Sequence, residues 1–350
     1  MKKKKWSCIL LVLAFVLALT ACQQGTEQKS TKQKTTEPKK VTEQKKVIDP
    51  KQLYTTAFQK TLDAKTYDCS IDADINVDTS NLQGEYKEFA DVINNAKLTV
   101  DIKANEETKQ SELVFKGKFS YRNLTMDFNV PVYMDEDKQR GYIKLDSMLK
   151  NFGIFLGTSQ NHLESVKDKY LEFPLEDDQS FTSYTEEKIK QKSRESLNKM
   201  TGDLPQNKFK KEELTSKEKQ QGATQKVTLS LSDKEMKAAF IKLIDVMGKA
   251  MNDPISKSEL SEMEDMLKKI TVKKLKMTGT IDDKETFRNY DAAILVKVQH
   301  SDFSGDIGLR LSTSYKHINE DVTLMDKPKK DQIVSEDEFE KILTIAPQKI

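Results

Sequence analysis

The sequence predicts an α+β fold built on an antiparallel sheet, and two observations support this. Apolar and polar residues alternate with a period of two over most of 68–132 and again over 275–315, the pattern of a sheet that is buried on one face only. Helical patterns precede or separate these strand series instead of following every strand, which argues against βαβ units. The 350 residues leave roughly 300 for a folded region, enough for one large domain.

The folded region is expected to begin with a helix at Asp49 and Pro50, because Asp is a favoured N-cap and Pro a favoured first helical residue. Helical spacing continues at Leu53, Tyr54, Ala57, Phe58, Thr61 and Leu62. A strand follows at 68–78, where apolar side chains alternate with a row that is mostly acidic. This row lacks the glycine turn and terminal glutamate of a calcium loop, so we interpret it as a solvated strand face.

The rest of the first half is interpreted as a short helix and a series of strands. Leu82, Tyr86, Phe89 and Ile93 have helical spacing. Period-two alternation then predicts strands at 98–104, 113–121 and 124–132, with shorter candidates at 142–145 and 171–175. Consecutive strands joined by short polar turns are typical of an antiparallel meander.

The second half follows the polar stretch 179–224, which contains a weak helical pattern at 184–200. A strand at 227–231 runs into a capping box formed by Ser232 and Glu235, and a second box, Ser256 with Glu259, begins another helix. Strands are predicted at 272–281, 290–298 and 303–315, with a bulge near Lys273 and Lys274. We also expect an edge strand around Val322 and Leu324 and a capped helix at 335–343.

The N-terminus has the layout of a secretory signal. Four lysines, Lys2 to Lys5, precede an apolar run at 9–19, and small residues then lead to Cys22. The run from Trp6 to Ala21 is short for a transmembrane anchor, which is the alternative interpretation, because a span needs about 20 apolar residues.

The composition limits the classes of function. Four of the 58 basic residues leave with the signal, so 54 remain against 56 acidic residues, interleaved along the chain. This argues against a nucleic-acid partner. Residues 23–46 are polar and almost free of apolar side chains, as in a flexible tether. A coil of roughly 25 residues spans about 25–30 Å.

The sequence contains no motif of an enzyme or metal site. It has no nucleophile elbow, P-loop or H-E-x-x-H helix, and no two of His162, His300 and His317 have metal-ligand spacing. We therefore expect no catalysis, no metal and no cofactor. Cys69 lies on an apolar strand face without a disulfide partner in the mature chain, and we interpret it as a buried structural thiol.

Two sets of apolar residues are candidates for ligand binding. The first lies on the helices predicted after Ser232 and Ser256 and comprises Met236, Phe240, Met247, Met251 and Met263. The second lies in an apolar run at 148–156 and comprises Met148, Phe152 and Phe155. Methionine adapts to irregular apolar partners. The alternatives are core packing against the sheet for the first set and a buried short helix for the second.

The residues Leu19-Thr20-Ala21-Cys22 resemble the lipobox of bacterial lipoproteins. This resemblance implies that the Cys22 thiol receives a diacylglyceryl group and that cleavage before Cys22 makes it the N-terminus. The tether, the helix ending in Leu62-Asp63-Ala64-Lys65-Thr66-Tyr67 and the Asp-alternating strand together resemble the LolA/LppX-like lipoproteins of low-GC Gram-positive bacteria. That family implies a strongly curved half-barrel sheet with helices over its concave face, and no catalytic residues.

The expected organisation is therefore a signal peptide at 1–21, a lipidated tether at 22–47 and a single domain at 48–345 with a polar insertion at 179–224. The protein is expected on the extracytoplasmic face of the cell membrane, held by its lipid. Two hypotheses for its function remain open. One is a binding protein for an apolar or amphiphilic ligand in a groove between sheet and helices, and the other is an envelope interaction module without a cavity.

Overall fold

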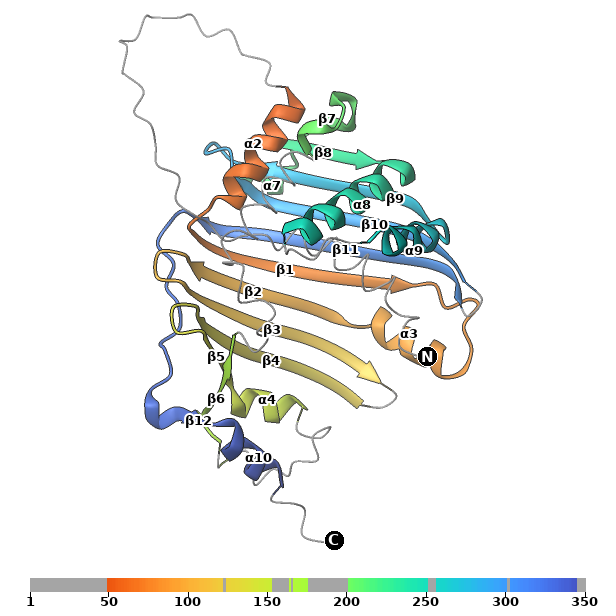
Figure 1. The fold of residues 1–350 in the computed structure, drawn as a ribbon. Helices are drawn as coiled ribbons and strands as arrows, with labels where there is room; N and C mark the ends of the chain where they lie inside the picture. Colours follow the sequence, from red (N-terminus) through yellow and green to blue (C-terminus); the bar gives the residue numbers. More distant parts are fainter. Residues whose placement is uncertain are drawn as a thin grey trace, which may run out of the picture.

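The computed structural model describes residues 49–121, 124–152, 164, 166–175, 201–250, 256–300 and 303–344. Twelve strands among these residues form one sheet in the order β12-β6-β5-β4-β3-β2-β1-β11-β10-β9-β8-β7 (Figure 1). The predicted α+β class is confirmed. The sheet stays open, with β12 and β7 at its two edges. It is mixed, because β12 pairs with β6 in parallel while the other neighbours are antiparallel.

The strands of the first half follow the predicted meander: β1 (Thr66–Val77), β2 (Lys97–Asn105), β3 (Gln110–Tyr121), β4 (Leu124–Asp135), β5 (Arg140–Lys144) and β6 (Tyr170–Pro174). Those of the second half are β7 (Phe209–Lys211), β8 (Gln225–Leu231), β9 (Ile270–Ile281), β10 (Phe287–His300), β11 (Phe303–Ile318) and β12 (Ile333–Val334). β1 lies between β2 and β11, so the last long strand joins the two halves at the middle of the sheet.

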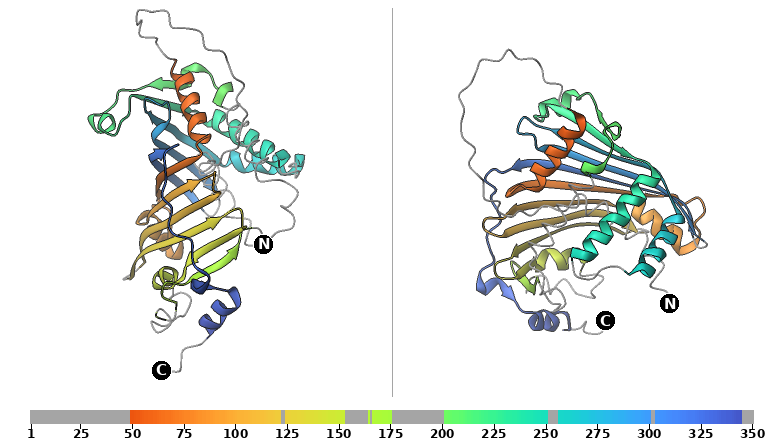
Figure 2. Two further views of the ribbon diagram at one scale, coloured as in Figure 1. Left: turned by 90° about the vertical axis from the view of Figure 1, so that its left-hand side faces the viewer. Right: turned by 45° about the horizontal axis from the view of Figure 1, so that its top comes forward.

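The described helices are α2 (Pro50–Leu62), α3 (Gly84–Asn94), α4 (Leu145–Phe152), α7 (Ser216–Gln220), α8 (Asp233–Ala250), α9 (Lys257–Lys268) and α10 (Glu336–Thr344). Figures 1 and 2 show α2, α8 and α9 on one face of the sheet, over the strands of its second half. The predicted caps are confirmed. The Asp49 side chain accepts from the backbone of Lys51, and Ser256 with Glu259 forms a complete capping box. The Ser232 hydroxyl accepts from the Glu235 backbone, and the Glu235 carboxylate accepts from the Ser232 backbone.

The two faces of the sheet differ as the alternation predicts. Apolar side chains point toward α2 and α8 and build the main core. The opposite face carries cross-strand polar pairs, such as Asp101 with Lys116 at 2.5 Å and Asp291 with Arg310 at 3.3 Å. The predicted bulge is also confirmed, because β9 changes register against β10 between the partners Lys274 and Val272.

The structure corrects one prediction at the C-terminal side and adds edge strands that the sequence did not reveal. Val322 and Leu324 belong to 321–329, which has no regular secondary structure. Both edges of the sheet end instead in very short strands, β7 and β12, one of which lies inside the polar stretch. The predicted helix at 82–93 exists as α3, but Tyr86 and Phe89 on it are 66% and 50% exposed.

Candidate functional site

The half of the apolar face under α2 and α8 is filled by side chains. Tyr54 on α2 and Tyr290 on β10 are buried, and their hydroxyls lie 2.9 Å apart in a hydrogen bond. Phe209 and Phe287 pack around the Tyr54 ring with centroids 5.4 and 5.6 Å away. Burial strongly raises the pKa of both tyrosines, that of Tyr290 to about 12. This cluster therefore holds α2 on the sheet as a neutral, closed core.

The first predicted binding set belongs to this core where it is described. Met236 and Phe240 are 1% and 4% exposed, and Met263 packs half-buried against the same cluster. Met251 lies outside the described residues, and Met247 falls within α8 with its side chain outside the described set. At the two described α8 positions, the side chains occupy the space between helix and sheet.

The second predicted set lies elsewhere. Met148 packs against a separate small cluster of Leu145, Leu149, Val166 and Val334, near the β12 edge. Phe152 ends α4 with its side chain outside the described set, and Phe155 lies outside the described residues. The structure therefore does not bring Met148 together with Met236 and Phe240, and these residues do not form one groove.

The apolar face continues beyond the packed half, across β2, β3 and β4. We call this the β2–β4 face and define it by Leu98, Val100, Ile102, Leu113, Phe115, Phe119 and Phe128. The cross-strand partners Leu98 with Ala73 and Phe115 with Val100 place it on the same side as the core. Phe115 is 39% exposed and the other six are half-buried. On the same face of β4, Met126, Val130 and Val132 are each 8% exposed, so the uncovered part of the face is centred on Phe115 of β3.

Helices α3 and α4 contact this half of the sheet. α3 contacts β1 and β3, and α4 contacts β4 and β5. Ordered aromatic packing continues across the face, since Phe119 and Phe128 meet edge to face at 6.3 Å and the Phe128 ring lies over Gly117. Sequence reasoning placed the groove under α8 and missed this face. One signal could have found it, because 98–132 is a run of alternating strands with no helical pattern inside it.

A hollow of about 550 Å³ lies at the other end of the fold, beside the start of α2. It is lined by Asp49, Lys51, Gln52, Thr55, Gln59, Gly202 and Gln206. Asp49 accepts a hydrogen bond from Gln206, and Lys51 donates to the Gly202 carbonyl. These polar and charged groups do not match an apolar ligand.

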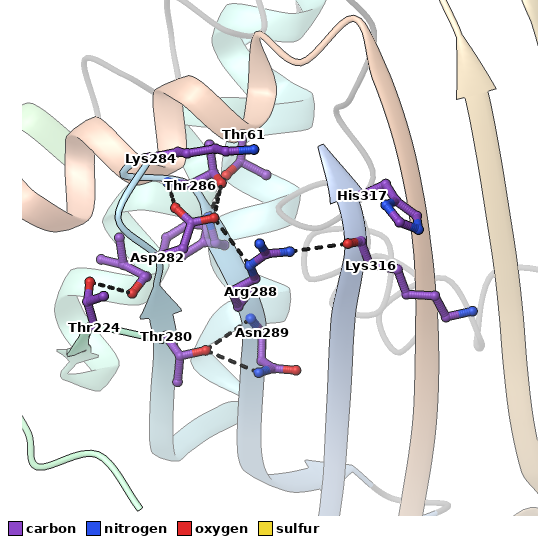
Figure 3. Close-up of polar contacts among 12 residues, drawn as sticks. Thr61, Thr224, Thr280, Asp282, Lys284, Thr286, Arg288, Asn289, Lys316 and His317 are labelled. Atoms are coloured by element: carbon purple, nitrogen blue, oxygen red, sulfur yellow. Dashed lines mark hydrogen bonds and ion pairs between the residues drawn. The ribbon is translucent and has the colours of Figure 1, made fainter. Parts of the chain in front are cut away.

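A buried polar cluster lies at the β9–β10 turn (Figure 3). Asp282, 4% exposed, accepts hydrogen bonds from the backbone and hydroxyl of Thr286 at 2.9 Å each and pairs with Arg288 at 3.2 Å. Arg288 also donates to the Lys316 carbonyl of β11, and the Phe287 backbone donates to the Thr61 hydroxyl of α2. The cluster therefore joins the turn to a helix and a neighbouring strand.

The single thiol of the described residues lies in the main core. Cys69 is 1% exposed in β1, and burial raises its pKa to about 12. The interpretation of Cys69 as a buried structural thiol is confirmed. His317 is exposed and pairs with Glu320 at 2.9 Å, while His162 lies outside the described residues and His300 ends β10.

No group of three or more His, Cys, Asp or Glu side chains in the described residues is arranged to hold a metal ion. None of the described helices combines the length and the apolar character needed to cross a membrane.

No family model matches the chain, and neither the search of curated proteins nor that of solved structures found a significant match.

Proposed function

We propose that this protein is a lipid-anchored, non-enzymatic binding protein on the extracytoplasmic face of the cell membrane, and that its β2–β4 face binds an apolar or amphiphilic, lipid-like ligand. The observation that carries the proposal is the change in coverage along one face. Core residues such as Met277 and Leu311 are 4% and 1% exposed beneath the helices, whereas Phe115 on the same face is 39% exposed.

The chemistry of the β2–β4 face favours an acyl chain or a similar apolar group. Its seven defining side chains are aliphatic or aromatic, and none carries a charge. Apolar surface contributes about 25 cal/mol per Å² when it is removed from water. Each 100 Å² covered by a ligand would therefore contribute about 2.5 kcal/mol before the costs of association. A charged headgroup would find no ion-pair partner among these seven side chains and would stay at the margin of the face.

The proposed anchor places this surface near lipid. Lipidation of Cys22 would attach the chain to the bilayer, and the tether at 22–47 would leave the domain free within about 25–30 Å of it. We extend the proposal to the shape of the sheet, as a strongly curved, LolA/LppX-like half-barrel with the β2–β4 face on its concave side. A concave face would surround an acyl chain more completely than a flat one.

Binding can be tested on the chain from Gln23 onward, which includes every described residue. A fluorescent fatty acid or lysolipid should bind saturably, and Phe115→Asp should weaken binding by about tenfold or more, because a carboxylate on this face would have to be desolvated. Tyr86→Asp is the matched control, because it also adds a carboxylate at an exposed aromatic position, but outside the β2–β4 face. Equal loss in both variants, or no saturable binding by the parent chain, would contradict the proposed site.

The second candidate is an envelope interaction module that binds another protein. The solid packing at Met236 and Phe240 and the exposure of Tyr86 on α3 favour it. A parent chain that binds no lipid probe, but captures a protein partner that Tyr86→Asp releases, would decide for this candidate.

A further inference from the structure

The segment between β11 and β12 crosses the sheet instead of joining it. Residues 321–329 have no regular secondary structure and connect the central strand β11 with the far edge at β12. Figure 1 shows this segment passing the ends of β1 to β5 on its way to β12 and α10. A chain that runs across strands cannot form a ladder of backbone hydrogen bonds with them. Its attachment therefore depends on individual side-chain contacts.

The first contacts attach the segment to the middle of the sheet. The backbone of Asn319 donates to the Thr66 carbonyl at 2.8 Å, and the Thr66 hydroxyl donates to the Glu320 carbonyl at 2.6 Å. β2 adds Lys103, which donates to the Thr323 carbonyl at 3.3 Å. β3 adds Glu112, which accepts from the Met325 backbone at 3.0 Å. Three neighbouring strands thus hold the segment in succession.

The contact with the most deeply buried side chain lies on β4 and β5. Asp135 is 2% exposed, and its carboxylate lies 2.7 Å from the Lys327 ammonium and 3.3 Å from that of Lys138. Lys327 also lies 5.7 Å above the ring of Tyr142. Tyr142 and its cross-strand neighbour Tyr133 are buried although they face the polar side of the sheet. Within the segment, Lys327 therefore supplies the positive charge that balances the buried carboxylate of Asp135.

The charges around Asp135 favour this contact. Burial alone would raise the pKa of Asp135, but hydrogen bonds from Lys327 and Lys138 outweigh it and hold the pKa below its usual value. The groups that face this carboxylate are Lys327 from the segment, Lys138 from the turn, and Tyr133 and Tyr142 from the strands. The Lys138 side chain is 61% exposed, so it does not cover the Asp135 carboxylate in the way that Lys327 does.

Beyond Lys327 the chain closes the far edge of the sheet. β12 pairs with β6 over two residues, Gln332 donates to the Asp168 carbonyl, and Lys169 donates to the Asp331 carbonyl. Val334 and Phe339 pack in the small cluster with Leu145 and Leu149, which is separate from the main core. The C-terminal end is therefore attached by a two-residue strand pair, two side-chain hydrogen bonds and one small apolar cluster.

We propose that residues 319–344 form a releasable clasp, which opens as one unit when the Lys327–Asp135 contact is lost and exposes the β6 edge while β8 to β11 remain folded. The inference goes beyond ligand binding and does not depend on it. The clasp has two properties that such a unit requires. Single hydrogen bonds and an ion pair hold its crossing segment, and its apolar cluster is distinct from the core that stabilises the rest of the sheet.

Amide hydrogen exchange on the full-length protein in mild detergent tests this. Lys327→Gln should speed exchange in 319–344 and 170–174 by about tenfold or more, with β10 and β11 unchanged. Lys118→Gln is the matched control, because it removes an exposed pair with Asp127 on neighbouring strands, at 57% and 70% exposure. This control should leave both regions unchanged.

The wild-type protein provides a second measurement in case Lys327→Gln does not fold. In low urea, the amides of 319–344 should exchange through an opening of lower free energy than those of β10 and β11. Unchanged exchange in Lys327→Gln, an equal effect of Lys118→Gln, or a single opening shared by the whole sheet would each overturn the clasp.

Discussion

Glycine lies beneath phenylalanine at three described positions of the sheet. A Cβ at Gly117, Gly141 or Gly279 would lie 2.1 to 2.2 Å from the ring of Phe128, Phe173 or Phe287. In the sequence, Gly117 and Gly279 simply occupy apolar-face positions of alternating strands. These positions are glycine because the aromatic ring of a residue on the neighbouring strand occupies the space that a Cβ would need. Local pattern therefore identified the face of these residues but not their role.

Phe240 supports a quantitative prediction at this scale. Phe240→Ala should lower the free energy of unfolding by about 3–5 kcal/mol, because the residue is 4% exposed in the main core and its removal leaves a cavity. Urea unfolding of the chain from Gln23 onward measures this. Phe115→Ala, at a 39% exposed position, is the control and should cost much less. Equal losses would mean that α8 does not pack as described.

At the scale of elements, helix caps were the most predictable features. Ser232, Ser256 and Ser335 each pair with a glutamate three residues later, and all three contacts form. A cap is decided by residues within one turn, so the sequence contains everything that it needs. The tertiary structure added Lys208, which pairs with Glu235 at 2.7 Å from outside α8.

This added contact predicts a pH dependence. Hydrogen bonds from Lys208 and then from Ser232 lower the pKa of Glu235 to about 2. An unfolded glutamate titrates near about 4.3, so the Glu235 contribution to stability is complete above that pH and is lost as pH falls toward 2. The difference in unfolding free energy between wild type and Glu235→Gln should therefore shrink between about pH 5 and pH 3.

Urea titrations at several pH values in this range would measure the difference. Glu262→Gln, at an exposed position of α9 away from the Glu235 contact, is the control. A Glu235→Gln difference that stays constant across this pH range would contradict the contact with Lys208.

At the scale of the whole molecule, the anchor and the sheet make separate contributions. The proposed anchor depends on a short N-terminal sequence pattern. The proposed binding surface depends instead on the pairing of β2, β3 and β4 within residues 98–132. Loss of one should leave the other intact. A soluble chain without Cys22 should therefore still bind the lipid probe.

The anchor gives the prediction for this scale. Cys22→Ala should abolish metabolic labelling with radioactive palmitate and leave the protein unprocessed or released, because the thiol that would receive the diacylglyceryl group is missing. Two acyl chains hold a protein firmly on a bilayer where one does not, at about 0.8 kcal/mol per buried CH₂. Cys69→Ala is the control and should keep its label, since Cys69 is buried in β1. Normal labelling of Cys22→Ala would refute the anchor.

The sequence by itself determined the α+β class, the long strands with their two faces, the helix caps and the β9 bulge, because each depends on neighbours within one element. Only the tertiary structure decided that β1 lies between β2 and β11, that Met148 is separate from Met236, and that 321–329 crosses the sheet. It also decided which part of the apolar face the helices cover. These features depend on contacts between residues far apart in the chain, and a period-two pattern is the same whether or not a helix packs on it.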